Sequence, residues 1–143
     1  MQIFEKLKPL AVLFLRLSLG VIFGYSGYQK LFVTMAATLG DFQRMGLPLY
    51  LAYVAGVLEL FGAILLVLGL LTRVTALLLA VEMAIGLFKV HIPQGGIYAV
   101  PNYQFPLALC AAAFALATFG AGLLSMDAMT FERAGKARPK SRS

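Results

Sequence analysis

The 143-residue chain is 61% hydrophobic and 13% charged, whereas ordinary soluble domains are about 45–50% apolar and about 25% charged. This composition excludes a soluble globular domain and predicts a membrane protein. The formal net charge of +6 owes much to five cations within residues 133–143. They predict a basic tail that faces an anionic membrane surface, and no binding of nucleic acid.

Four apolar runs are long enough to cross a bilayer, which takes roughly 20 mainly apolar residues per helix. They lack the alternation of apolar and polar residues that membrane strands show, so helices are predicted. The four runs cover about residues 10–31, 48–70, 74–91 and 104–124. The sequence therefore predicts an all-α fold, a transmembrane four-helix bundle over residues 1–128, followed by a disordered basic tail over residues 129–143.

The region between the first two runs, residues 33–45, is too polar to span a membrane. It is a candidate for a short helix at the membrane interface.

An even number of spans places both termini on one side of the membrane, and the distribution of cations predicts which side this is. Eight cations fall on the side of the termini and of the turn between the second and third runs: Lys6, Lys8, Arg73, Arg133, Lys136, Arg138, Lys140 and Arg142. Because cytoplasmic segments carry the excess of Lys and Arg, both termini are predicted to be cytoplasmic.

Three charged residues lie deep inside the predicted spans, away from the helix ends: Arg16, Glu59 and Glu82. Each costs about 2.5–3.5 kcal/mol at the centre of a bilayer, so each requires a partner or a function. The two glutamates lie at nearly equal distances from the turn near Gly69, so they should share one depth. We expect Arg16 to contact one or both of them in a buried charge network, which either fixes the packing of the helices or forms a proton-active or ligand-binding centre.

Small residues surround these charges. Glycines that permit close helix packing share a face with Arg16 or flank Glu59: Gly20, Gly24, Gly27, Gly56 and Gly62. The alanine-rich fourth run is a candidate surface for a homo-oligomer. His91 and Cys110 are the only residues of their types, so a metal site or a thiol relay within one chain is not expected.

The residues form an ordered pattern along the chain: Arg16-x3-Gly20-x2-Phe23-x3-Gly27-x2-Lys30, then Glu59-x2-Gly62 ahead of Gly69-Leu-Leu-Thr-Arg73, then Gly120-x-Gly122-x2-Ser125-x-Asp127. This pattern, over about residues 10–128, resembles the DoxX family of small four-helix bacterial membrane proteins. The chain departs from the family at Ala121 and Leu123, where relatives often carry Pro and Arg, and at Gln104, where an acidic residue is common.

The resemblance implies a multi-pass protein of the bacterial cytoplasmic (inner) membrane that acts as a redox-associated accessory subunit. The family name derives from subunits of a thiosulfate:quinone oxidoreductase, so any enzymatic role would be that of a subunit of a quinone-linked oxidoreductase. Two alternatives remain open. One is a non-catalytic anchor or assembly factor for a soluble partner, and the other is a small proton-coupled transporter.

A quinone offers two carbonyl oxygens that need hydrogen-bond donors at interfacial depth, and its reduction takes up protons. Donors of this kind gather near one membrane face: Tyr28, Lys30, Tyr53, Lys89, His91 and Gln104. An aromatic belt at the interface would equally account for the tyrosines. No covalently bound cofactor is expected, so electrons would come from a soluble or membrane-bound redox partner protein.

Overall fold

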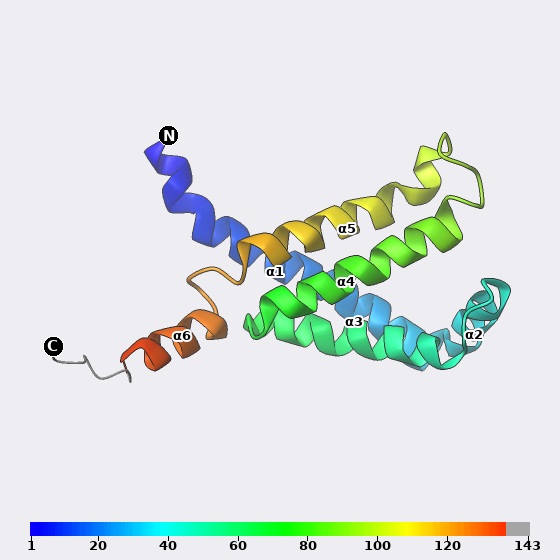
Figure 1. The fold of residues 1–143 in the computed structure, drawn as a ribbon, viewed down its shortest axis with the longest axis horizontal. Helices are drawn as coiled ribbons and strands as arrows, with labels where there is room; N and C mark the ends of the chain where they lie inside the picture. Colours follow the sequence, from blue (N-terminus) through cyan, green and yellow to red (C-terminus); the bar gives the residue numbers. More distant parts are fainter. Residues whose placement is uncertain (137–143) are drawn as a thin grey trace, which may run out of the picture.

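The computed structural model describes residues 1–136, and every regular element in this part of the chain is helical. The described residues contain six α-helices, which are labelled in Figure 1. Two of them continue directly into π-helical turns, η1 after α1 and η2 after α4. In chain order the elements are α1 (Gln2–Tyr28), η1 (Gln29–Val33), α2 (Met35–Arg44), α3 (Tyr50–Leu68), α4 (Thr72–Gly86), η2 (Leu87–His91), α5 (Val100–Phe119) and α6 (Met126–Lys136).

Four of the helical segments are long and apolar enough to cross a membrane. They are Gln2–Val33, Tyr50–Leu68, Thr72–His91 and Val100–Phe119. The predicted all-α fold with four transmembrane helices is therefore confirmed. The fourth span lies earlier in the chain than residues 104–124, because Pro101 fits the first turn of α5 and Gly120, at φ +81°, ends it.

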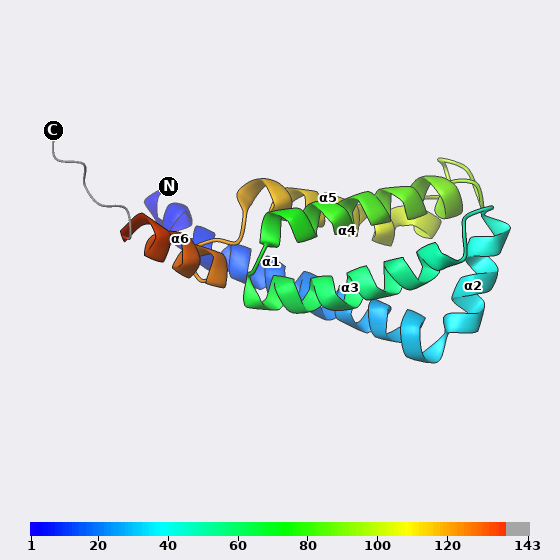
Figure 2. The same ribbon diagram turned by 60° about the horizontal axis from the view of Figure 1, so that its bottom comes forward.

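The bundle is built from two closely packed helix pairs. Helix α1 packs mainly on α3, and α4 packs mainly on α5, while a smaller contact between α3 and α4 joins the pairs. Figure 2 shows the two pairs as separate layers that meet near the turn between α3 and α4. Large apolar side chains from all four helices fill the centre, among them Leu19, Phe23, Leu66, Leu79 and Leu116.

The two ends of the bundle differ in content. The N-terminus and helix α6 lie at the end that holds the turn between α3 and α4, which we call the turn end (Figure 1). Helix α2 and the connection between η2 and α5 lie at the opposite end, the loop end (Figure 1). This arrangement agrees with an even number of spans, and the side of the membrane that each end faces remains a prediction.

Two segments outside the spans are also helical. Residues Met35–Arg44 form α2, within the region predicted as an interfacial helix. The predicted disorder of the tail is wrong for residues 129–136, which belong to α6. Helix α6 forms because Ser125 Oγ accepts a hydrogen bond from the Ala128 N–H (3.1 Å) and Asp127 lies in the first turn. Residues 137–143 lie outside the described part of the chain.

Candidate functional site

The candidate site lies where α1 packs closely on α3. A Cβ atom at Gly27 would lie 2.6 Å from the Leu60 backbone nitrogen, and one at Gly56 would lie 2.8 Å from the Leu31 side chain. The predicted packing glycines Gly20, Gly24 and Gly62 also meet neighbouring helices within 3.3 Å of such an atom. Without side chains at these positions, the backbones approach closely. The C-terminal part of α1 and the adjoining η1 therefore lie directly against α3.

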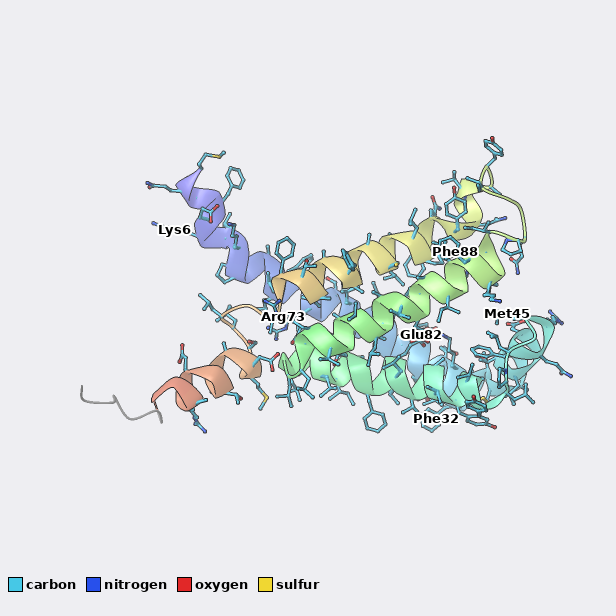
Figure 3. The ribbon with its side chains drawn as sticks, in the orientation of Figure 1. Lys6, Phe32, Met45, Arg73, Glu82 and Phe88 are labelled. Carbon is cyan, nitrogen blue, oxygen red and sulfur yellow. The ribbon has the colours of Figure 1, made fainter. Side chains whose placement is uncertain are left out.

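The close contact of α1 and η1 with α3 places Lys30 beside two carboxylates. Lys30 Nζ lies 2.6 Å from Glu59 Oε1 and 3.9 Å from Glu82 Oε1. The three residues come from η1, α3 and α4, and we call them the carboxylate cluster. Since both glutamates contact one ammonium group, they lie side by side, as their equal distances from the turn predict. Figure 3 shows Glu82 midway along α4.

The carboxylate cluster is incompletely hydrogen-bonded. Glu59 is 0% exposed, and its Oε2 atom has no hydrogen-bond partner in the described chain; the same holds for both carboxylate oxygens of Glu82. Buried polar atoms are normally paired, and an unpaired one carries a large desolvation cost. The cluster therefore has three oxygen atoms available to a proton, a water molecule or a donor group of a ligand.

The expected contact between Arg16 and the glutamates is wrong. Arg16 is 2% exposed, and its guanidinium donates four hydrogen bonds to backbone carbonyl oxygens. The acceptors are Leu66 (2.9 Å) and Val67 (3.0 Å) of α3, and Ala121 (2.8 Å) and Leu124 (2.7 Å) after α5. Arg16 lies about 20 Å from Lys30 along α1, at 1.5 Å per residue, so it reaches the turn end and not the cluster.

The last carbonyl groups of a helix have no partner within it, and a cation there also interacts favourably with the helix dipole. At the C-terminal end of α3, Arg16 supplies both the hydrogen-bond donors for these carbonyl groups and the cation. Gly69, at φ +70°, completes the termination: its N–H donates to Leu66 O (3.2 Å), and the Leu70 N–H donates to Leu65 O (2.9 Å), which is a Schellman motif.

Asp127 binds the backbone in the same region, at the start of α4. Its Oδ1 accepts a hydrogen bond from the Leu71 N–H (2.9 Å), and its Oδ2 accepts one from the Thr72 N–H (3.0 Å). The carboxylate thus caps α4, beside the strained φ of +49° at Leu71. We call Arg16, Asp127 and their backbone partners the arginine junction. Sequence reasoning missed the role of Asp127, although its motif with Gly120, Gly122 and Ser125 was the available signal.

Of the six predicted quinone-site residues, the hydrogen bonds and ion pairs within residues 1–136 join only Lys30 to the glutamates. Tyr28 is half exposed and packs on Phe32, with ring centroids 5.3 Å apart. His91 lies in η2, with Nδ1 3.1 Å from Gly86 O. The other three, Tyr53, Lys89 and Gln104, are exposed at the surface.

Both π-helical turns carry candidate residues, Lys30 in η1 and Lys89 with His91 in η2. Short π-helical segments inside longer helices occur frequently at functional sites. Within the described residues, no group of three His, Cys, Asp or Glu side chains could hold a metal ion.

The fold and the buried charges define a class: a small membrane protein with four spanning helices and an ionisable cluster in its interior. The family model named DoxX matches residues 11–92, more than half of the chain. The chain belongs to the DoxX family.

Similarity to individual proteins extends further along the chain. A Bacillus subtilis protein carrying the name putative oxidoreductase CatD is 34% identical over 125 residues, which cover 86% of this chain and 89% of the relative. An uncharacterized protein of Haemophilus influenzae is 38% identical over 104 residues, covering 73% of this chain and 72% of the relative. An uncharacterized membrane protein of Mycobacterium tuberculosis is 38% identical over 92 residues, covering 62% of this chain and 56% of the relative. No solved structure shows significant similarity to the chain.

Proposed function

We propose that the protein is a redox-associated membrane subunit that binds a quinone beside the carboxylate cluster and exchanges protons with it. One observation carries the proposal: three oxygen atoms of Glu59 and Glu82 are buried next to a lysine and have no hydrogen-bond partner in the described chain. Membership in the DoxX family and the printed name of the Bacillus subtilis relative support a redox setting.

The proposal gives different roles to the three side chains. Glu59 is wholly buried, whereas the side chains of Lys30 and Glu82 keep 27% and 16% of their exposure. A ligand therefore reaches Lys30 first, because the carboxylate oxygens of Glu59 and Glu82 are buried. The Lys30 ammonium can donate a hydrogen bond to a quinone carbonyl oxygen while Glu59 holds it in place, and Glu82 can hold a proton in the low-dielectric interior.

Reduction of a quinone to a quinol takes up two electrons and two protons. In this proposal a partner protein supplies the electrons, and Glu82 passes protons from the solvent to the reduced oxygens. The chain then acts as the membrane-side subunit of an oxidoreductase and does not turn over alone.

The proposal includes a location and an orientation. The protein is placed in the cytoplasmic membrane of a bacterium with both termini in the cytoplasm, because the turn end carries the excess of cations in the sequence. The carboxylate cluster then opens toward the outer half of the bilayer. A reporter fused after Ser143 should be active in the cytoplasm, and activity confined to the periplasm would contradict this orientation.

The binding of quinone can be tested on the purified protein. Extraction with organic solvent should release bound quinone, and a short-chain quinone should change the intrinsic tyrosine fluorescence in a saturable manner. Lys30→Met and Glu82→Gln should abolish this response. Asp127→Asn, a change of similar size at the opposite end of the bundle, is the matched control and should keep it.

Absence of bound quinone together with no saturable response in the wild-type protein would contradict the proposal and favour a non-catalytic anchor. A response that survives in both cluster variants would place quinone elsewhere on the protein. Identification of proteins that copurify with the chain provides the complementary test, because the proposal requires a redox partner that carries electrons.

A further inference from the structure

At the turn end, a hollow of about 370 Å³ lies between the start of α4 and the end of α5. Arg73, Thr72, Phe119, Gly120 and Asp127 are among the residues that line it. Figure 3 shows Arg73 at the N-terminal end of α4, beside the C-terminal end of α5. The Arg73 side chain lies against Gly120, where a Cβ atom would come within 2.9 Å of its Nε. The hollow thus holds one exposed cation in a defined position.

The polar groups in this hollow are not mutually satisfied. No carboxylate within residues 1–136 forms an ion pair with Arg73, because both oxygens of Asp127 accept hydrogen bonds from the backbone. Thr72 is 0% exposed, and its Oγ1 has no hydrogen-bond partner in the described chain. A guanidinium and a buried hydroxyl without partners are the groups that recognise a phosphate.

A second hollow begins where the first one ends. This groove of about 570 Å³ runs between α3 and α4, and Leu71 and Val74 line both hollows. Its other lining residues are almost all apolar, including Val57, Phe61 and Leu78. From Leu65 to Tyr53 the groove follows about 18 Å of α3, at 1.5 Å per residue. A site for an anion is therefore continuous with a track for a hydrocarbon chain.

We propose that these two hollows together form a binding site for one anionic phospholipid. The phosphate binds Arg73 and Thr72 at the turn end, and one acyl chain lies in the groove between α3 and α4. The pairing of charge with apolar track favours this occupant, because a free phosphate would leave the groove unused and an uncharged lipid would leave Arg73 unpaired. The site is independent of the proposed quinone function, since it shares no residue with the carboxylate cluster.

Binding can be measured by native mass spectrometry of the full chain, delipidated in mild detergent and titrated with dioleoyl lipids. Phosphatidylglycerol should bind about fivefold more tightly than phosphatidylcholine, whose choline cation offsets the charge of its phosphate; this is the ratio expected for one cation near an anionic headgroup. Arg73→Gln should abolish the preference, while Arg73→Lys should keep most of it. The matched control is Lys6→Gln, which removes an exposed cation outside the hollow and should leave the preference intact.

The groove is tested separately. Val57→Trp should fill it and reduce binding of both lipids, whereas Val81→Trp, on an exposed position of α4 that lines neither hollow, should not. Equal binding of the two lipids by the wild-type protein, or an equal effect of Lys6→Gln and Arg73→Gln, would overturn the proposal. Binding of inorganic phosphate as tight as that of phosphatidylglycerol, or competition by a short-chain quinone, would also overturn it, because either result would assign a different occupant.

Discussion

The arginine junction and the carboxylate cluster both bury charge inside the same bundle. In the junction, Arg16 donates hydrogen bonds to four carbonyl oxygens and both oxygens of Asp127 accept backbone N–H groups. In the cluster, Lys30 donates one hydrogen bond to Glu59, and three of the four carboxylate oxygens have no hydrogen-bond partner in the described chain. A complete set of hydrogen bonds indicates a structural role, whereas buried polar atoms without hydrogen-bond partners indicate a site that can bind a proton or a ligand.

The difference also follows the backbone. The junction closes helix ends, where free carbonyl and N–H groups offer partners for charged side chains. The cluster lies beside helical backbone whose polar groups already pair with each other, so its side chains have only one another. Substitutions in the two regions should therefore have different consequences for stability and for ligand binding.

Arg16→Leu should have the largest effect on stability. It removes four hydrogen bonds from a charged donor and leaves their acceptors unpaired, so we expect a loss of about 4 kcal/mol in the free energy of unfolding. Unfolding in detergent by increasing fractions of SDS would measure it. Arg16→Lys, which keeps the charge but offers fewer fixed donors, should lose less; equal stability of the leucine variant and the wild type would refute the structural role.

Combining Arg16→Leu with Glu59→Gln sharpens the distinction between the regions. Since Arg16 binds carbonyl oxygens and Glu59 binds Lys30, the two losses should add. Recovery of stability in the double variant would show that these residues interact after all.

Lys30→Met should cost about 3 kcal/mol, because it leaves two buried carboxylates without their cation. The added change Glu59→Gln should restore part of this loss, since it removes one of the stranded charges. The same SDS titration would measure both variants. A lack of coupling between the two positions would contradict the ion pair.

Gly27→Ala should cost about 2 kcal/mol through overpacking, because the new Cβ would lie 2.6 Å from the Leu60 nitrogen. It should also draw Lys30 away from Glu59 and weaken quinone binding. Gly86→Ala is the matched control: apart from its chain neighbours and the backbone of its own helix, its Cβ meets no atom of the described chain within 4 Å, so it should not lower thermal stability. If Gly27→Ala left the free energy of unfolding unchanged, this would contradict the close contact of α1 with α3.

Asp127→Ala should have the smallest effect, about 1 kcal/mol, as for the loss of other helix caps. Thermal unfolding in detergent should detect it, and quinone binding should be unchanged. A parallel loss of quinone binding would show that the two regions are not independent.

The sequence predicts the spans and the packing glycines because hydropathy and small-residue spacing are local properties. It also indicates the shared depth of Glu59 and Glu82, since both distances are counted from one turn. The partners of Arg16 were not predictable in this way. Its acceptors are backbone carbonyls at Leu66, Val67, Ala121 and Leu124. Every residue has a backbone carbonyl, so the residue types do not show which ones accept hydrogen bonds.

The buried ion pair of Lys30 was not predictable from the sequence either. Its type and position near a helix end are equally typical of an exposed interfacial lysine, and only the approach of α1 to α3 directs it inward. The helical state of residues 129–136 depends on the Ser125 cap and on the anchoring of Asp127 at the turn, which the basic composition of the tail conceals.

Infrared difference spectroscopy tests the central claim most directly, namely that the carboxylate cluster exchanges protons with a ligand and the arginine junction does not. Spectra of the protein with and without a short-chain quinone should contain a change in the carbonyl stretch of a protonated carboxylic acid. This band should disappear in Glu82→Gln and persist in Asp127→Asn. A wild-type spectrum without the band, or a band that persists in Glu82→Gln and Glu59→Gln alike, would contradict the account.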